Sequence, residues 1–381
     1  MRQRGRGDLS VTPAQAAAFR LARHRLIDGA APAGARAPLA DVVRDTAGIQ
    51  AQVQSSAELA IWTRRRQTTR GEVRRALWET RDLVKTSAMR LTLHLVPARD
   101  FAVYVAATRP ASMETLARWQ GRVGATPQQV RALVDAIVES LGDGGRTQQE
   151  LIALAKKRAG RGLRGWLDHA WSGVRPAVIE GAIVYGPPRG AEATFVRADA
   201  WLGAQRMPTA DAARAELLRR FLAAFGPADA HDFAKWSGMR VTDARGVVDA
   251  LRGELMQVSV DGAAGWIRRA DARALAASEL DPDAVRLLGP FDSFLLAHVT
   301  KEHLVDARDY KRVYRPQGWI SAVVLRGGQI IGVWTTRTES RAIAVDVALF
   351  RRASAAVRAA IAGEVDAMRH FLGAATVVHF V

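Results

Sequence analysis

Residues 229–269 read DAHDFAKWSGMRVTDARGVVDALRGELMQVSVDGAAGWIRR. The stretch from Asp229 to Trp236 predicts a helix that a glycine ends, and Thr242 stands where it would cap a second helix. Alternating apolar residues then predict two short strands joined by a glycine-containing turn. Two helices followed by a hairpin are the plan of a winged helix-turn-helix, which we expect over residues 209–275.

The same order of elements is repeated upstream, in residues 121–208. Thr147 and Glu150 match a capping box, in which each side chain accepts a hydrogen bond from the other residue's backbone N–H. A further helix is predicted over residues 163–180, and a hairpin over residues 182–197 around a Gly-Pro-Pro turn. This stretch therefore predicts a second winged helix.

A less regular copy of the pattern occupies residues 10–120. Thr12 followed by Pro13 predicts the start of a helix, and Thr69 predicts the start of another. Residues 83–96 alternate in the manner of strands. Three copies in tandem indicate winged helices more strongly than any single copy does.

Residues 276–381 follow a different pattern, with two strands around Gly327 and Gly328. The elements predicted after them are a strand over residues 341–349, an amphipathic helix over 355–372 and a final strand over 375–381. We expect a small module that packs on the third winged helix. The predicted fold is therefore α+β, with three tandem winged helix-turn-helix units and a C-terminal α/β module.

The chain has 55 lysines and arginines against 38 acidic residues, a formal net charge of +17 over 381 residues. Such an excess favours a polyanionic partner, because each neutralised phosphate releases bound counterions. A GC-rich genome would explain the preference for arginine over lysine, but not the excess of positive charge. Nucleic acid is favoured over a membrane, since neither terminus has a strongly amphipathic basic segment. No transmembrane helix is expected, because no uncharged apolar run approaches the ~18 residues that are needed to span a bilayer.

Cysteine is absent, which excludes disulfides and thiolate metal sites. The eight histidines show no paired ligand spacing, and the sequence has no phosphate-binding loop or dinucleotide fingerprint. We therefore expect neither a metal nor an organic cofactor. The first ten residues are polar and basic with no apolar stretch after them, so we expect no secretory signal and a cytoplasmic, nucleoid-associated protein.

Gln50 and Gln52 are the first candidate site residues. In an extended stretch residues i and i+2 point the same way, so two neutral amides would share one ligand or one water. Spacing alone favours the alternative, a set of ordinary surface amides.

A second candidate set consists of Arg90, Thr92 and His94, which alternate within a predicted strand. On one strand face, Arg90 and Thr92 would contact phosphates and His94 would lie near a reactive centre. The alternative is a solvated strand face, or a histidine that is hydrogen-bonded in the core.

Arg64, Arg65 and Arg66 form a short basic run. Such runs usually lie on solvated helix faces. This run follows the glutamines on a helix that continues from them, so it is also a candidate for holding the DNA backbone.

Several ordered motifs resemble the AlkZ-like winged-helix DNA glycosylases of bacteria, in the branch with a Gln-x-Gln motif. The residues that carry the resemblance are Gly48 to Gln52, Arg90 to Pro97, Leu288 to Leu296, Gly327-Gly328 and Gly332 to Trp334. Together they span nearly the whole chain. One departure is Leu91, where many relatives have glycine.

The resemblance implies a C-shaped arrangement of the three units around a basic channel. It implies a monomeric, monofunctional enzyme that hydrolyses the N-glycosidic bond of alkylated purines in double-stranded DNA. The Gln-x-Gln branch is associated with unhooking bulky N7-alkylguanine adducts and interstrand crosslinks, often as self-resistance to genotoxic natural products. Gln50 and Gln52 would position the attacking water, and the DNA-binding residues would be Arg64, Arg65, Arg90, Thr92 and His94.

Neutral amides suit this chemistry although they are poor general bases. N7-alkylation makes guanine a cationic leaving group, so the reaction needs a placed water and a favourable field more than a strong base. The alternative from another class is a non-catalytic winged-helix regulator, which would prefer one operator and usually dimerise. RNA binding is the third and least favoured interpretation.

Overall fold

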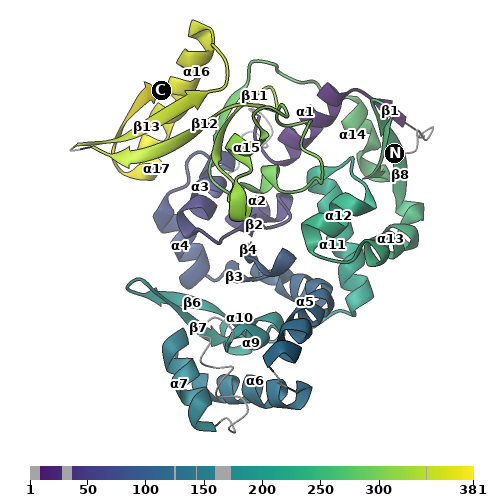
Figure 1. Ribbon diagram of the computed structural model, residues 1–381, viewed down its shortest axis with the longest axis vertical. Helices are drawn as coiled ribbons and strands as arrows, with labels where there is room; N and C mark the ends of the chain where they lie inside the picture. The colour runs from purple at the N-terminus through teal and green to yellow at the C-terminus, as the bar shows by residue number, and fades with distance from the viewer. Residues whose placement is uncertain (1–8, 28–36, 124–125, 143, 159–172, 340) are drawn as a thin grey trace.

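The computed structural model describes residues 9–27, 37–123, 126–142, 144–158, 173–339 and 341–381. Within these ranges the strands form three three-stranded sheets and one five-stranded sheet. Figure 1 shows these sheets in separate parts of the molecule, with helices and loops between them. The protein therefore combines α and β structure, as the sequence predicts. Among the described helices, none has the length and apolar character needed to cross a membrane.

The part of the chain that contains the two glutamines has one small antiparallel sheet, in the order β2-β4-β3. Thr69 caps a helix through a capping box with Glu72, as predicted. The elements in this part are α2 (Leu39–Asp45), β2 (Ile49–Gln50), α3 (Gln54–Arg64), α4 (Arg70–Trp78), β3 (Leu83–Ser87), β4 (Leu93–Pro97) and α5 (Phe101–Val123).

A turn interrupts the run of strand that was predicted over residues 83–96. The 3-10 turn Met89–Leu91 separates β3 from β4, and φ is 57° at Arg90 and 59° at Leu91. These angles lie in the left-handed region, which glycine adopts at no steric cost. The backbone thus explains why glycine suits position 91. It also means that the prediction of one strand face for Arg90, Thr92 and His94 is wrong.

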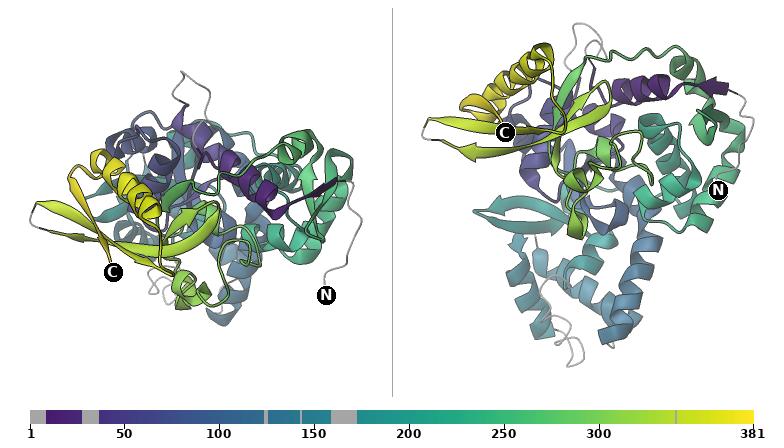
Figure 2. Two further views of the ribbon diagram at one scale, coloured as in Figure 1. Left: turned by 90° about the horizontal axis from the view of Figure 1, so that it is seen from above. Right: turned by 45° about the horizontal axis from the view of Figure 1, so that its top comes forward.

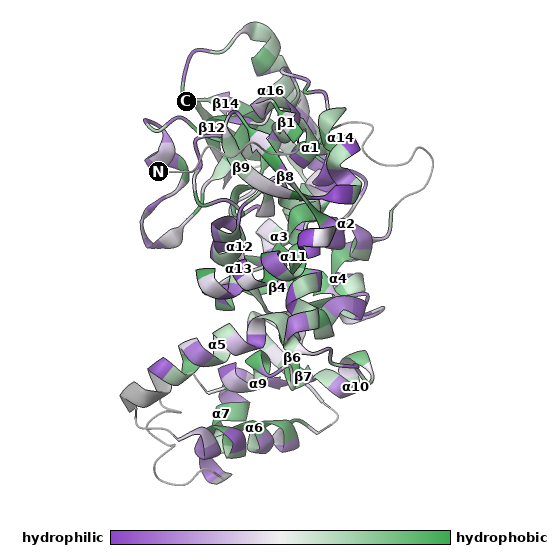
Figure 3. Ribbon diagram, turned by 90° about the vertical axis from the view of Figure 1, so that its right-hand side faces the viewer, coloured by the Kyte–Doolittle hydropathy of each residue, from purple (hydrophilic) through white to green (hydrophobic). Residues whose placement is uncertain are grey.

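The second unit has its own hydrophobic core between α6, α7, α9 and the hairpin β6-β7. Thr147 and Glu150 make the predicted capping box. Residues 163–172 of the predicted helix lie outside the described residues. The elements are α6 (Pro127–Leu141), β5 (Arg146–Thr147), α7 (Gln148–Arg158), α9 (Arg175–Ile179), β6 (Ile183–Arg189), β7 (Glu192–Arg197) and α10 (Ala198–Leu202). Figure 3 shows hydrophobic positions along α6 and α7 in this unit.

The third unit follows the prediction for residues 229–269. Asp229 caps the first helix and Gly238 ends it in the left-handed conformation. Thr242 is not the predicted cap, because the second helix already begins at Val241 after Arg240. The elements are α11 (Ala210–Phe225), α12 (Ala230–Ser237), α13 (Val241–Ala250), β8 (Leu255–Val260), β9 (Ala263–Arg268) and α14 (Ala272–Ala276).

The start of the described chain lies against the third unit, although the sequence places it in the first. β1 (Leu9–Val11) pairs in parallel with β8, so the third sheet has the order β1-β8-β9. Thr12 caps α1 (Pro13–Arg23), as predicted, and this helix packs on α11 and α14. Figure 2 shows α1 between the third unit and the C-terminal sheet.

The C-terminal module follows the predicted order of strands and helices. Its sheet has the order β10-β11-β12-β13-β14, and β14 runs parallel to β13 after the crossover through α16. The elements are β10 (Val285–Leu288), α15 (Tyr310–Val313), β11 (Ala322–Arg326), β12 (Gln329–Thr338), β13 (Ala342–Leu349), α16 (Ala355–Ala367), α17 (Arg369–Leu372) and β14 (Ala375–Phe380).

This module packs on α3 and α1 through two hydrophobic clusters, and it also contacts the third unit, as expected. Ala297 lies in the core cluster of that unit, and the Val299 backbone N–H donates to Asp232 Oδ1 at 2.8 Å. Leu59 and Trp62 lie three residues apart on α3 and share one hydrophobic cluster with the sheet and α16. Leu21 and Leu26, in and just after α1, enter a second cluster with the other side of the module. The glutamine segment therefore lies between the module and the remainder of its own unit.

Candidate active site

Gln50 is the last residue of β2, and its backbone pairs with His94 on β4. The strand ends there, because Gln52 lies in a bend and α3 begins at Gln54. Gln50 is 8% exposed, whereas Gln52 is exposed. The extended stretch that would point both amides the same way is therefore shorter than the spacing predicts.

The two amides nevertheless meet at the same turn. Gln50 Oε1 accepts a hydrogen bond from Arg90 Nη2 at 3.1 Å, and Gln52 Oε1 accepts one from the Leu93 backbone N–H at 3.4 Å. A guanidinium and a backbone N–H can only donate, so each amide must turn its oxygen toward the turn. Each NH2 group then points away from that contact, and no described residue accepts a hydrogen bond from it.

Thr92 and His94 are also part of this turn. Thr92 Oγ1 donates to Met89 O at 3.0 Å, and His94 Nδ1 donates to Thr92 O at 2.9 Å. Burial, and then the charge of Arg90, lower the pKa of His94 to about 3. His94 is thus a neutral, buried histidine that holds the turn together, which matches the alternative given by the sequence.

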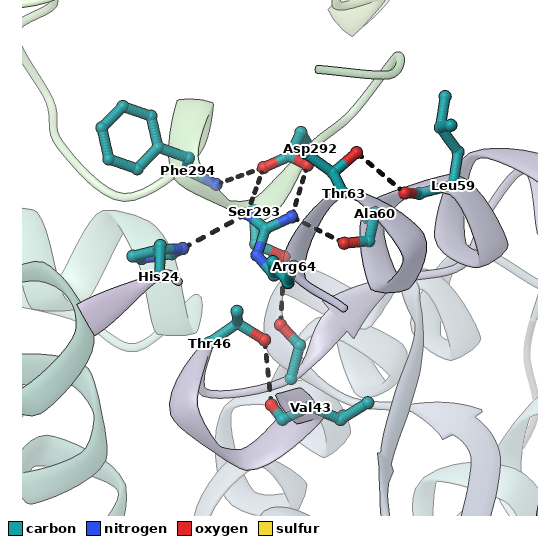
Figure 4. Close-up of polar contacts among 11 residues, drawn as sticks. His24, Val43, Thr46, Leu59, Ala60, Thr63, Arg64, Asp292, Ser293 and Phe294 are labelled. Carbon is teal, nitrogen blue, oxygen red and sulfur yellow. Dashed lines mark hydrogen bonds and ion pairs between the residues drawn. The ribbon is translucent and has the colours of Figure 1, made fainter. Parts of the chain in front are cut away.

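Arg64 has a different place from the one predicted. Its guanidinium makes a bidentate pair with Asp292, with distances of 2.8 Å from Nη1 to Oδ2 and 2.6 Å from Nη2 to Oδ1. Neither side chain has exposed surface. Figure 4 shows the pair between α3 and the loop after β10, with His24 and Phe294 beside it. The prediction that Arg64 contacts DNA is therefore wrong, because the side chain joins α3 to the C-terminal module.

The next two arginines also contact protein groups. Arg65 Nη1 donates to Thr68 Oγ1 at 2.9 Å, and its side chain is 14% exposed. Arg66 Nη2 donates to both carboxylate oxygens of Glu364 at 2.7 Å. The three arginines of the basic run therefore mostly contact neighbouring protein groups.

Asp292 and Ser293 belong to the motif Leu288 to Leu296, and both contact the part of the chain that contains the glutamines. Ser293 Oγ donates to Gly48 O at 3.1 Å, directly before the glutamine segment. The neighbouring Asp292 holds Arg64 at the end of α3. The loop from the C-terminal module therefore fixes both ends of the segment that contains Gln50 and Gln52.

A polar network at the start of α3 was not predicted from the sequence. Lys85 Nζ donates to Gln54 Oε1 at 3.0 Å, and Gln54 Nε2 donates to Glu58 Oε1 at 3.4 Å. Glu58 is only 2% exposed. Its spacing of four residues from Gln54 is the signal that would have placed the two side chains on one face of a helix. The Glu58 carboxylate also lies 3.9 Å from Arg70 Nε and 3.6 Å from Arg74 Nε, so it joins the start of α3 to α4.

Metal chemistry has no candidate site in the part of the chain that the structure describes. No group of three or more histidine and acidic side chains there is arranged to hold an ion.

Three buried histidines predict an acid-sensitive fold. Burial lowers the pKa of His24, His94 and His298, to about 3 for His94. Below the ordinary pKa of about 6.5 the unfolded chain binds protons that the folded chain does not, so the free energy of unfolding falls as the pH falls. At pH 5, His94 alone should account for a loss of about 2 kcal/mol. Urea unfolding at pH 7.5 and pH 5 measures this loss.

His94→Gln should reduce the difference between the two pH values, and the exposed His231→Gln should leave it unchanged. A free energy of unfolding that stays flat from pH 7.5 to pH 5 would contradict the interpretation of the buried histidines.

Repeated helix–hairpin units on a strongly basic chain are typical of proteins that bind nucleic acid, and the paired amides add a candidate reaction centre. The family model described as "DNA glycosylase AlkZ-like" matches residues 43–371. The chain therefore belongs to the AlkZ-like DNA glycosylase family. It is an enzyme that hydrolyses N-glycosyl bonds in DNA.

A sequence comparison and a structural comparison with Streptomyces sahachiroi agree with this assignment. The chain is 33% identical over 303 residues to the "Interstrand DNA cross-link repair glycosylase" of Streptomyces sahachiroi. This match covers 77% of this chain and 81% of that protein. The solved structure of Streptomyces sahachiroi DNA glycosylase AlkZ superposes with a TM-score of 0.86 at 28% identity. That match covers 98% of this chain and all of the other.

Proposed function

We propose that this glycosylase excises N7-alkylated purines from double-stranded DNA, including bulky adducts and interstrand crosslinks. The observation that carries the proposal is the pair of neutral amides, Gln50 and Gln52, held at one turn with their oxygens engaged and their NH2 groups free for a ligand. The name of the Streptomyces sahachiroi relative supports interstrand crosslinks as substrates.

In the proposed reaction the bond from the anomeric carbon to N9 breaks, and the base leaves with the electron pair as a neutral alkylpurine. The amides orient a water that bonds to the anomeric carbon. They do not take its proton, because an amide is not a useful base at neutral pH, so the attached water releases that proton to bulk water. The alkylated base leaves readily because N7-alkylation gives it a positive charge, and the amide dipoles and the placed water then lower the remaining barrier. Without a general base, the enzyme would be restricted to substrates whose base already carries a positive charge from alkylation.

The same proposal covers how DNA is held. The three helix–hairpin units would act as winged helices arranged as a C around a basic channel, and the enzyme would act as a monomer on DNA of the nucleoid. Of the residues predicted to contact DNA, Arg65 and Thr92 are partly exposed and remain candidates.

The test is release of base from DNA that carries a single N7-methylguanine, with EDTA present throughout. We expect base release that EDTA does not change, because the proposed reaction needs no metal. Parallel substrates with a bulky N7-guanine adduct and with an interstrand crosslink define the range of lesions. Sequence-specific binding by a dimer without release of any base would instead favour a winged-helix regulator.

A further inference from the structure

Arg90 occupies an unusual position between two parts of the molecule. It lies in the turn Met89–Leu91 with φ 57° and ψ 22°, a conformation that residues with side chains rarely adopt. Gly238, at the end of α12, packs directly on its backbone. A Cβ at position 238 would be 3.1 Å from both N and Cα of Arg90. The turn and the end of α12 therefore fit closely together.

The guanidinium of Arg90 makes two contacts with protein acceptors. Nη1 donates to the backbone oxygen of Trp236 on α12, and Nη2 donates to Gln50 Oε1 at 3.1 Å. The guanidinium is planar with donors in fixed directions, so alignment on Trp236 also sets the direction of the bond to Gln50. No carboxylate of a described residue forms an ion pair with Arg90, and burial lowers its pKa to about 10.

These contacts decide which atoms Gln50 presents. An amide side chain has two orientations that exchange its oxygen and its NH2 group, and without a partner the two differ little in energy. Arg90 has no acceptor, so it stabilises the orientation in which Oε1 faces it. The hydrogen bond also draws electron density from the amide, which makes the outward N–H groups stronger donors.

We propose that Arg90 is a positioning residue that locks the Gln50 amide with its NH2 group toward the reaction centre, and that it is not a contact to the DNA backbone. The inference rests on the proposed function of Gln50. It replaces the phosphate contact that the sequence predicts for Arg90, because two of its five N–H groups already hold the guanidinium against Trp236 O and Gln50 Oε1.

The main experiment measures single-turnover excision of N7-methylguanine at saturating enzyme for Arg90→Met and Arg90→Lys. We expect Arg90→Met to slow excision by about 10- to 100-fold, less than the ~100- to 1,000-fold effect of losing an oriented donor outright, because the Gln50 amide is still present. Affinity for undamaged DNA should stay within about 3-fold, and its salt dependence should not change. Arg90→Lys keeps the charge but not the two-point geometry, so it should recover only part of the rate. Arg273→Met, on an exposed residue of α14, controls for the loss of one surface charge.

A second comparison separates positioning from a general structural defect. In a Gln50→Ala background, Arg90→Met should slow excision no further, because Arg90 would act through Gln50. If Arg90→Met slowed excision in the Gln50→Ala background by the same factor as in the wild type, the proposal would be overturned. The proposal would also be overturned by an unchanged rate at saturating enzyme with a salt slope lowered by about one, which is the signature of a lost phosphate contact.

The proposal can also be tested without activity. Urea unfolding of Arg90→Met, Gln50→Ala and the double variant tests whether the two side chains are coupled. The shifts in the urea midpoint of the single variants should not add up to the shift of the double variant. Additive shifts would contradict the proposed role of Arg90. A wild-type protein that releases no base but shows this coupling would therefore refute the proposed function and leave the contact between the two residues established.

Discussion

The Gln50→Ala, Gln52→Ala double variant should lose excision by about 100- to 1,000-fold while it still folds and binds DNA, a range taken from the loss of oriented donors in other active sites. The amides contribute dipoles and position, which matter in the transition state and hardly at all for binding of the DNA backbone. Within the described residues, the two side chains hydrogen-bond only to the Arg90–Leu93 turn, so their removal should leave the remainder of the fold intact.

The measurement is single-turnover excision of N7-methylguanine together with DNA affinity at fixed salt. Gln329→Ala is a suitable control, because it removes an exposed amide from β12 in the C-terminal module. Excision by the double variant at the wild-type rate would remove Gln50 and Gln52 from the mechanism. A parallel loss of DNA affinity would show that they act in binding.

Arg64→Ala should lower the free energy of unfolding by about 3–5 kcal/mol, the range for breaking a buried ion pair by removal of one partner. The substitution leaves the carboxylate of Asp292 buried without its charge partner, and it also removes the hydrogen bond from Nη1 to Ala60 O at 2.9 Å. Because Asp292 lies in the loop that also anchors Gly48 through Ser293, excision should decrease as well.

Urea unfolding measures this effect, with Arg65→Ala, directly after the end of α3, as the neighbouring control. Arg65 pairs with Glu72 only at a long distance of 3.8 Å, so its loss should cost less than the loss of Arg64, about 1 kcal/mol. Arg64→Met combined with Asp292→Leu should be less destabilising than Arg64→Ala, because no charge is then left buried. Normal stability of Arg64→Ala with weakened DNA binding would restore the role that the sequence predicts for this residue.

Local signals in the sequence predicted much of the fold. The helix starts at Thr12, Thr69 and Thr147 are confirmed, because a capping box is formed by residues three positions apart. The hairpin at Gly327 and Gly328 is also confirmed, since these two glycines take positive φ in the turn. The start of α13 was misplaced, because a side-chain cap was expected at Thr242 and the structure uses none.

The sequence by itself determined the class of fold, the family and the segment that contains the candidate active site, because capping residues, turn residues and ordered motifs are short-range features. The tertiary structure alone decided what the side chains do. Arg64 and Asp292 are 228 positions apart, and Arg90 and Trp236 are 146 apart. An arginine looks the same in a sequence whether water or a buried acceptor surrounds it. Which of these it meets depends on packing between distant segments, and that packing made Arg64 a structural residue and placed Arg90 on Gln50.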